Sequence, residues 1–293
     1  DLNIAMDAIA VITYPGHFMS TLGTIKNFLE VTHWRSPVYI FVDDLGLQWE
    51  SWPNYIDDLT DAVNSNFPEL NTTYIKFSEF GFPHVWDGWL RQQLVKLNLD
   101  MILPGNLWYV TDGDVILNRI PNANEIPFNL IPTRKILNNT QRDSYIRHML
   151  GDVEFLKFNG ERVYTHHVPC RWVTKNDLQD LRRYVSDRFK NDFNLVHYHL
   201  MREERITGYG STPEHLSMTE WDLLETWRIS IDQQMPEFRH WLISKEKSAD
   251  SSTLTTFNTF FGVDCDLDLD HFKNQGILVN SVHWDKCQAI KRT

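Results

Sequence analysis

The feature that most constrains the fold is an alternation of apolar runs and helical segments in the first 77 residues. Apolar, β-rich runs occupy residues 4–14, 37–42 and 74–77, and segments with helical periodicity at 22–31 and 55–65 separate them. This order is typical of a mostly parallel sheet with helices on its faces. We therefore predict a mixed α/β fold. Because ligands of such sheets gather at the carboxyl ends of the strands, we expect the functional site at that edge.

A pair of carboxylates follows the next predicted strand. Residues 107–110 are apolar and lead into Asp112-Gly113-Asp114, and a second apolar run begins at Val115. Unpaired carboxylates are costly on a bend between buried strands, and a divalent cation between them offsets that cost. Mg²⁺ and Mn²⁺ prefer carboxylate oxygens and keep open positions for phosphates. The pattern suggests a metal-bound nucleotide diphosphate, although Asp and Gly are also typical of a plain tight turn.

The segment before this strand is predicted to be an amphipathic helix. Within residues 86–99, tryptophans and leucines recur at helical spacing, and Arg91, Gln92, Gln93 and Lys96 form a polar set. The helix leads directly into the strand that carries the two aspartates. We expect its two cations to lie near the metal end only if the helix packs across that end.

Local signals place further elements. Ser20 or Thr21 is expected to cap the first helix, and Asn176 is expected to cap a helix over residues 177–189. The alternation of residues 197–199, His-Tyr-His, is strand-like. A histidine pair there suits a metal, but half-buried strand histidines explain the pattern better.

Composition narrows the class of function. The formal net charge of −11 argues against a broad electrostatic footprint for DNA or RNA, without excluding a local basic site. The three cysteines, Cys170, Cys265 and Cys287, match no zinc-site spacing, so we expect a reduced, cytoplasmic protein. No apolar run reaches the ~18 residues of a transmembrane helix, so none is expected.

The chain is predicted to form one domain. Hydrophobic residues make up 42% of the 293 residues, which is enough for a sizeable core. No internal repeat, linker or break in composition divides residues 1–293. We expect a nucleotide- and metal-binding half over residues 1–120 and an acceptor-side half over residues 121–293.

Taken together, the early strands, the Arg-containing helix and the Asp-x-Asp strand end resemble the GT-A class of nucleotide-sugar glycosyltransferases. Residues 88–97, GWLRQQLVKL, are similar to the W-x-RQQ-x-x-KL helix of a bacterial and phage family of uncharacterised GT-A-like proteins. Residues 166–167, His-His, and 219–221, Thr-Glu-Trp, stand where that family has a His-His pair and Ser-Glu-Tyr. The likeness spans roughly residues 4–230. Gly113 replaces the family's usual Ser or Ala and removes no ligand.

The resemblance implies a metal centre. Asp112 would approach the ribose, or the metal through water, and Asp114 would ligate Mn²⁺ or Mg²⁺ bridging the diphosphate. In several GT-A families a C-terminal histidine completes the metal shell, and a lysine shortly after it touches phosphate. His283 and Lys286 match that pattern, with a surface or core histidine as the alternative.

The resemblance also implies contacts to the rest of the donor. Thr13 and Tyr14, at the end of the first predicted strand, would line the base pocket. Asp43 or Asp44, at the end of the second, would accept a hydrogen bond from the base or the ribose.

Three further side chains complete the implied site. Arg91 and Lys96 would meet phosphate or position the sugar, and Arg suits a bidentate phosphate contact. Glu220 is the candidate general base toward the acceptor hydroxyl. An acidic residue at a helix start, favoured by the helix dipole, is the alternative for Glu220.

These expectations predict a metal-dependent hexosyl- or pentosyltransferase. It would move a sugar from a UDP- or GDP-linked donor to a hydroxyl of a glycan, a small molecule or, less favoured, a modified nucleobase. A nucleotidyltransferase on a similar fold is one alternative, but residues 13–24 hold only Gly16 and Gly23, short of a Gly-rich loop. A non-catalytic carbohydrate- or nucleotide-binding protein is another, against which the intact Asp112 and Asp114 count.

Overall fold

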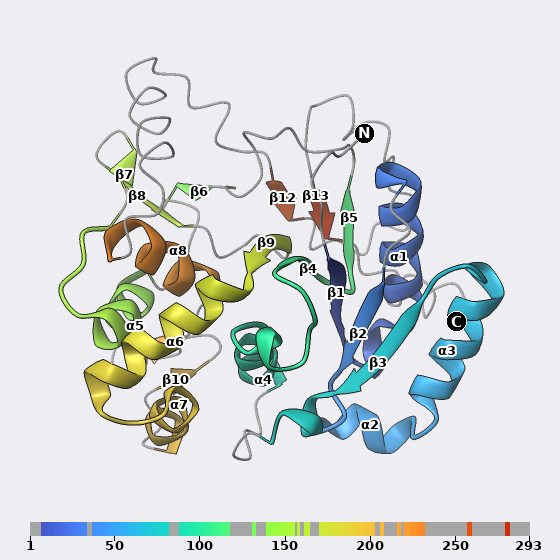
Figure 1. Ribbon diagram of the computed structural model, residues 1–293, viewed down its shortest axis with the longest axis horizontal. Coiled ribbons are helices and arrows are strands. Elements are labelled where there is room, and N and C mark those ends of the chain that lie inside the picture. The colour runs from blue at the N-terminus through green and yellow to red at the C-terminus, as the bar shows by residue number, and fades with distance from the viewer. Residues whose placement is uncertain are drawn as a thin grey trace, which may run out of the picture.

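A five-stranded sheet forms the centre of the computed structural model of the chain, in the order β3-β2-β1-β4-β9 (Figure 1). The structure describes residues 7–33, 37–81, 88–117, 131–132, 139–155, 157–158, 161–164, 170–202, 206–207, 216–217, 220–231, 257–259 and 279–281. The strands of this sheet are β1 Ala8–Thr13, β2 Val38–Val42, β3 Thr72–Lys76, β4 Leu107–Asp112 and β9 Cys170–Thr174.

The topology of the sheet creates a switch point between β1 and β4. Strands β1, β2, β3 and β4 run parallel, and β9 pairs antiparallel with β4. The chain steps outward from β1 to β3 and then returns to the other side of β1. Ile12 is opposite Asp112 in the register, so both strands end at the same edge. The predicted mixed α/β fold with a mostly parallel sheet is confirmed, and its switch point is where ligands of such sheets bind.

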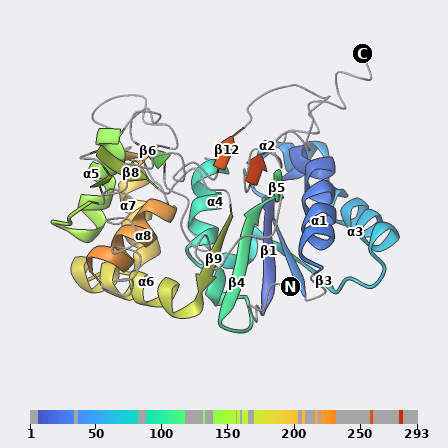
Figure 2. The same ribbon diagram turned by 90° about the horizontal axis from the view of Figure 1, so that it is seen from above.

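Helices cover both faces of the sheet (Figure 2). Side chains alternate along β1, so Ile9 and Val11 join a core with α1 and α3, while Ala8, Ala10 and Ile12 face α4 and the later helices. The helices are α1 Phe18–Thr32, α2 Leu47–Ser51, α3 Tyr55–Asn66, α4 Gly88–Lys96, α5 Asn139–Leu150, α6 Lys175–Phe189, α7 Phe193–Arg202 and α8 Glu220–Ser230. Within the described ranges, no helix is long and apolar enough to cross a membrane.

The remaining elements are short. Strand β13 pairs antiparallel with β5, and Ser281 is opposite Val115. A late part of the chain therefore returns to the strand that directly follows the second aspartate. The short elements are η1 Pro15–His17, η2 Phe77–Phe80, η3 Leu99–Met101, β5 Val115–Leu117, β6 Ile131–Pro132, β7 Lys157–Phe158, β8 Glu161–Tyr164, β10 Ile206–Thr207, β11 Leu216–Ser217, β12 Phe257–Thr259 and β13 Val279–Ser281.

Two predicted helix caps are wrong. Helix α1 begins at Phe18, so Ser20 and Thr21 lie inside it and are buried. Helix α6 is capped by Thr174, whose extended backbone ends β9 and whose side chain accepts a hydrogen bond from the backbone N–H of Asp177. Asn176, two residues later, already has a place in the first helical turn and cannot act as the cap.

The strand-like interpretation of residues 197–199 is also wrong, because they belong to α7. Phe193, Val196, His197 and Leu200 are all buried and recur at helical spacing, so they form one face of the helix. His199 is exposed. An alternation over only three residues is too short to distinguish the two-residue period of a strand from the 3.6-residue period of a helix.

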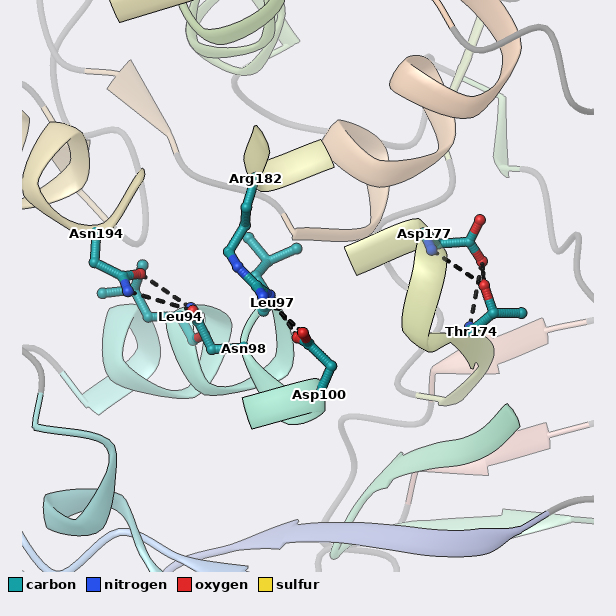
Figure 3. Close-up of polar contacts among 8 residues, drawn as sticks. All are labelled: Leu94, Leu97, Asn98, Asp100, Thr174, Asp177, Arg182 and Asn194. Carbon is teal, nitrogen blue, oxygen red and sulfur yellow. Dashed lines mark hydrogen bonds and ion pairs between the residues drawn. The ribbon is translucent and has the colours of Figure 1, made fainter. Parts of the chain in front are cut away.

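Polar contacts at the C-terminal end of α4 fix this helix against α6 and α7 (Figure 3). The Arg182 guanidinium on α6 donates to the carbonyl oxygen of Leu97 at 2.6 Å and to both carboxylate oxygens of Asp100 at 2.5 and 2.7 Å. The side-chain amide of Asn98 donates to Asn194 on α7 at 3.0 Å. Because α4 is anchored in this way, side chains along it are held in defined positions toward the sheet.

Candidate functional site

Asp112 ends β4 and Asp114 lies in the turn that joins β4 to β5, and this turn is clamped to β1 and α1. The backbone N–H of Gly113 donates to the carbonyl of Ile12 at 2.8 Å, and that of Val115 donates to Thr24 Oγ1 at 3.0 Å. A Cβ on Gly113 would stand 2.7 Å from Thr21 Oγ1, closer than real Cβ atoms come. A larger residue here would force α1 or the turn to shift, because α1 packs directly on the turn.

Helix α4 holds the first aspartate from the interior. Asp112 Oδ1 accepts a hydrogen bond from Gln92 Nε2 at 3.0 Å and lies 2.8 Å from Lys96 Nζ. The same ammonium lies 3.0 Å from Glu220 Oε1 at the start of α8. The backbone N–H of Glu220 donates to Gln93 Oε1 at 2.9 Å. The predicted helix is confirmed, but its polar face is turned into the protein: Lys96 is 2% exposed and Gln93 3%.

The charges of this cluster shift each other's protonation. Burial would lower the pKa of the Lys96 ammonium, but attraction from Asp112 and Glu220 raises it above its usual value. Burial, opposed by Lys96 and reinforced by the negative charge of Asp114, raises the pKa of Asp112 to about 7. The two aspartates are therefore close enough to repel each other. A divalent cation would relieve that repulsion and favour the ionised form of Asp112.

Arg91 and Asp43 form a second buried ion pair at the same edge of the sheet. The guanidinium donates from Nε to Asp43 Oδ1 at 3.0 Å and from a terminal nitrogen to Oδ2 at 2.7 Å. The backbone N–H of Asp43 donates to the carbonyl of Thr13 at 3.0 Å. The Asp44 carboxylate instead accepts two hydrogen bonds from Ser78, one from the backbone N–H at 3.0 Å and one from the hydroxyl at 2.6 Å. The roles predicted for Arg91 and Asp43 in donor binding stay predictions.

Two predicted site residues stand at the end of β1: Thr13 is buried, and Tyr14 is only partly buried. Thr13 is 2% exposed, and its Oγ1 lies 2.6 Å from Thr21 Oγ1 and 3.3 Å from the Tyr55 hydroxyl. Tyr14 is only partly buried, and its hydroxyl lies 2.8 Å from Nε2 of His17. The two rings are 4.0 Å apart between centroids. Tyr14 is therefore the less buried of the two, with its ring against His17, whereas Thr13 is engaged in packing.

The structure brings together seven of the predicted site residues around the carboxyl ends of β1, β2 and β4. His283, Lys286 and the predicted His-His pair at 166–167 lie outside the described residues. Within the described part of the chain, no three His, Cys, Asp or Glu side chains are grouped so that they could hold a metal ion. The seven residues are Thr13, Tyr14, Asp43, Arg91, Lys96, Asp112 and Asp114, and an eighth predicted residue, Glu220 at the start of α8, joins them through its ion pair with Lys96.

Sequence reasoning assigned no individual role to Gln92 or Gln93, although both belong to the helix motif. Each contacts a site residue, Gln92 the carboxylate of Asp112 and Gln93 the backbone of Glu220. The sequence did hold a signal for these contacts. Residues 91–93 are three consecutive polar residues in a helix whose apolar residues recur at the spacing of buried positions, so some of the polar side chains had to face the interior.

The chain matches no protein-family model, and it matches none of the curated proteins. Among solved structures, it resembles galactosyltransferase LgtC in complex with donor and acceptor sugar analogs, with 13% identity and a TM-score of 0.37 over 65% of this chain and 69% of that one. An active-site mutant of LgtC aligns with 10% identity and a TM-score of 0.44 over 94% and 86% of the two chains.

A third similar structure is the apo-form glycosyltransferase GlyE of Streptococcus pneumoniae TIGR4. It has 9% identity and a TM-score of 0.34, over 82% of this chain and 51% of GlyE. These neighbours are glycosyltransferases. The fold class given above rests on the strand order and register of this chain itself.

Proposed function

We propose that this chain is a metal-dependent glycosyltransferase that uses a UDP- or GDP-linked sugar donor. The observation that carries the proposal is the position of Asp112 and Asp114. They lie on either side of Gly113 at the carboxyl edge of the sheet, in a turn that is hydrogen-bonded to β1 and α1, beside the switch point between β1 and β4. Two nearby carboxylates at this edge suit a cation that keeps open positions for a diphosphate.

The residues present fit a Mg²⁺ or Mn²⁺ ion. Asp114 and Asp112 would hold it, as hard oxygen ligands, and water and donor phosphates would fill the remaining positions. When bound, the ion supplies charge stabilisation for the departing nucleoside diphosphate. We keep His283 as the proposed third ligand and Lys286 as a proposed phosphate contact. In support, β13 is antiparallel to β5 with Ser281 opposite Val115, so the strand direction leads toward the turn.

The remaining side chains would prepare the site for the donor. Lys96 lies between the carboxylates of Asp112 and Glu220 in the interior and adds positive charge behind Asp112. The Arg91 and Asp43 pair fixes the edge of β2 beside Thr13. Tyr14 would stack on the base. Glu220 remains the proposed general base; its carboxylate is 3% exposed and bound to Lys96, so an acceptor would have to reach it at the start of α8.

Calorimetry of UDP and GDP, each with and without Mn²⁺, tests the donor site. We expect Mn²⁺-dependent binding of one nucleotide to the wild type and its loss in Asp114→Asn. Asp61→Asn is the matched control, because it removes the same charge from an exposed position on α3. If neither nucleotide binds the wild type with Mn²⁺ present, the proposal is wrong.

Transfer itself is tested by the release of nucleoside diphosphate from UDP- and GDP-sugars in the presence of candidate glycans, small molecules and modified DNA. We expect release with one donor, dependent on Mn²⁺ or Mg²⁺ and abolished in Asp114→Asn. Release of pyrophosphate from a nucleoside triphosphate, without release from any sugar nucleotide, would instead identify a nucleotidyltransferase.

A further inference from the structure

We propose that Gln92 is a positioning residue that orients the Asp112 carboxylate for metal binding; this inference rests on the proposed function. Gln92 and Lys96 are four residues apart on α4, so they lie on the same side of the helix. Both contacts end on the same oxygen of Asp112: Gln92 Nε2 lies 3.0 Å from Oδ1, and Lys96 Nζ lies 2.8 Å from it.

Two donors on one oxygen leave the other oxygen to a cation. Within the described residues, the polar side-chain contacts of Asp112 end on Oδ1. A carboxylate held at one oxygen by an amide and an ammonium from an anchored helix cannot rotate freely, so Oδ2 keeps one direction. Outer hydrogen bonds of this kind orient metal-binding carboxylates and raise their affinity for the metal.

Of the two donors, Gln92 is the one whose role can be isolated. Lys96 also binds Glu220, and it is 2% exposed, so its replacement would leave two carboxylates without their cation in the interior. Gln92 is only partly buried and carries no charge. Gln92→Met keeps the length, the net charge and the helix propensity of the side chain while removing the amide donor.

The adjacent residue provides a matched control. Gln93 is 3% exposed and accepts a hydrogen bond from the backbone N–H of Glu220 at 2.9 Å. Gln93→Met is the same chemical change on the same helix at a more buried position, and it leaves the contacts of Asp112 in place. A loss of stability alone would therefore affect Gln93→Met at least as strongly as Gln92→Met.

The experiment measures Mn²⁺ affinity by electron paramagnetic resonance of the free ion, with UDP and with GDP present, alongside thermal unfolding of each variant. We expect Gln92→Met to bind Mn²⁺ roughly 10- to 100-fold more weakly than the wild type. Gln93→Met is expected to bind Mn²⁺ as the wild type does. Its midpoint of thermal unfolding is expected to be no higher than that of Gln92→Met.

The outcomes separate this inference from the proposed function. If the wild type binds Mn²⁺, Asp114→Asn does not, and Gln92→Met binds as tightly as the wild type, the role of Gln92 is refuted and the metal site stands. Equal weakening in Gln92→Met and Gln93→Met would also refute it, since that result indicates a general effect of loosening α4. If the wild type binds no Mn²⁺ with either nucleotide, both proposals fail.

Discussion

A buried histidine is predicted to make the stability of this protein fall on acidification. His197 on α7 is fully buried, and in the described part of the chain its Nδ1 has no hydrogen-bond partner. Its Nε2 lies 3.4 Å from the hydroxyl of Tyr145, and the ring of Phe193 contacts it edge-on at 4.7 Å between centroids. Burial, with a smaller contribution from the nearby His148, lowers the pKa of His197 to about 3.

The sign and size of this effect on stability follow from the difference between the pKa of His197 in the unfolded chain and in the folded protein. The unfolded chain binds this proton near its ordinary pKa of ~6.5, whereas the folded chain resists it down to about 3. The folded state therefore has its full stability above pH ~6.5 and loses it as the pH falls toward the folded pKa. Between pH 7 and pH 5, His197 alone should reduce the free energy of unfolding by roughly 2 kcal/mol.

Urea unfolding of the wild type, His197→Leu and His199→Leu at pH 7 and pH 5 tests this prediction. The wild type and both variants contain the same other titrating groups. The contributions of these groups therefore cancel when the loss of unfolding free energy between pH 7 and pH 5 is compared among the three proteins. The loss in His197→Leu should be smaller than that of the wild type by roughly 2 kcal/mol. His199, exposed on the same helix, is the control and should leave the wild-type loss unchanged. An equal loss in His197→Leu and the wild type would refute the reasoning.

Three further substitutions test the packing around the site and its supporting helices. Gly113→Ala should destabilise the fold by ~1–3 kcal/mol because its Cβ meets Thr21 Oγ1, and Thr21→Ala in the same chain should recover part of that loss in thermal unfolding. Arg228→Leu removes the cation between two buried carboxylates of α6 and α8 and should cost ~3–5 kcal/mol in urea unfolding. The exposed ion pair of Arg183 is the control, and Arg183→Leu should cost less than ~1 kcal/mol. Thr174→Ala should cost ~1 kcal/mol by removing the α6 cap, measured in the same way.

The parallel strands of the sheet could be predicted from the sequence because their signal is local, whereas the antiparallel strand β9 was not predicted. Strands β1 and β2 are short apolar runs, β3 contains Tyr74 and Ile75, and the helices between these strands have clear periodicity, so their order indicates a parallel arrangement. Cap residues are harder to predict, because several neighbouring polar residues compete for the same role. Thr174 acts as the cap of α6 because β9 delivers it in an extended conformation, which the residues around Asn176 do not reveal.

The environment of the site could not be predicted, since it depends on contacts between distant segments. Lys96 and Glu220 are 124 positions apart in the sequence, yet they share a buried ion pair. A polar helix face in water and a polar face that meets carboxylates in the interior have the same pattern along the chain. The location of the candidate site at the carboxyl edge of the sheet could be predicted from the order of strands and helices. The partners of Arg91, Gln92 and Lys96 could be identified only from the structure.

The arrangement of α4 gives a physical reason for three consecutive polar residues in a buried helix. Successive side chains leave a helix about 100° apart, so three neighbours reach three different elements. Arg91 binds the residue after β2, Gln92 binds the last residue of β4, and Gln93 binds the first residue of α8. The separation between these strand ends and α8 is thereby set by one anchored helix and not by loops. The carboxylates of Asp112 and Asp43 are thereby held in place by the fold itself, which is the arrangement that the proposed metal and donor site would need for oriented binding.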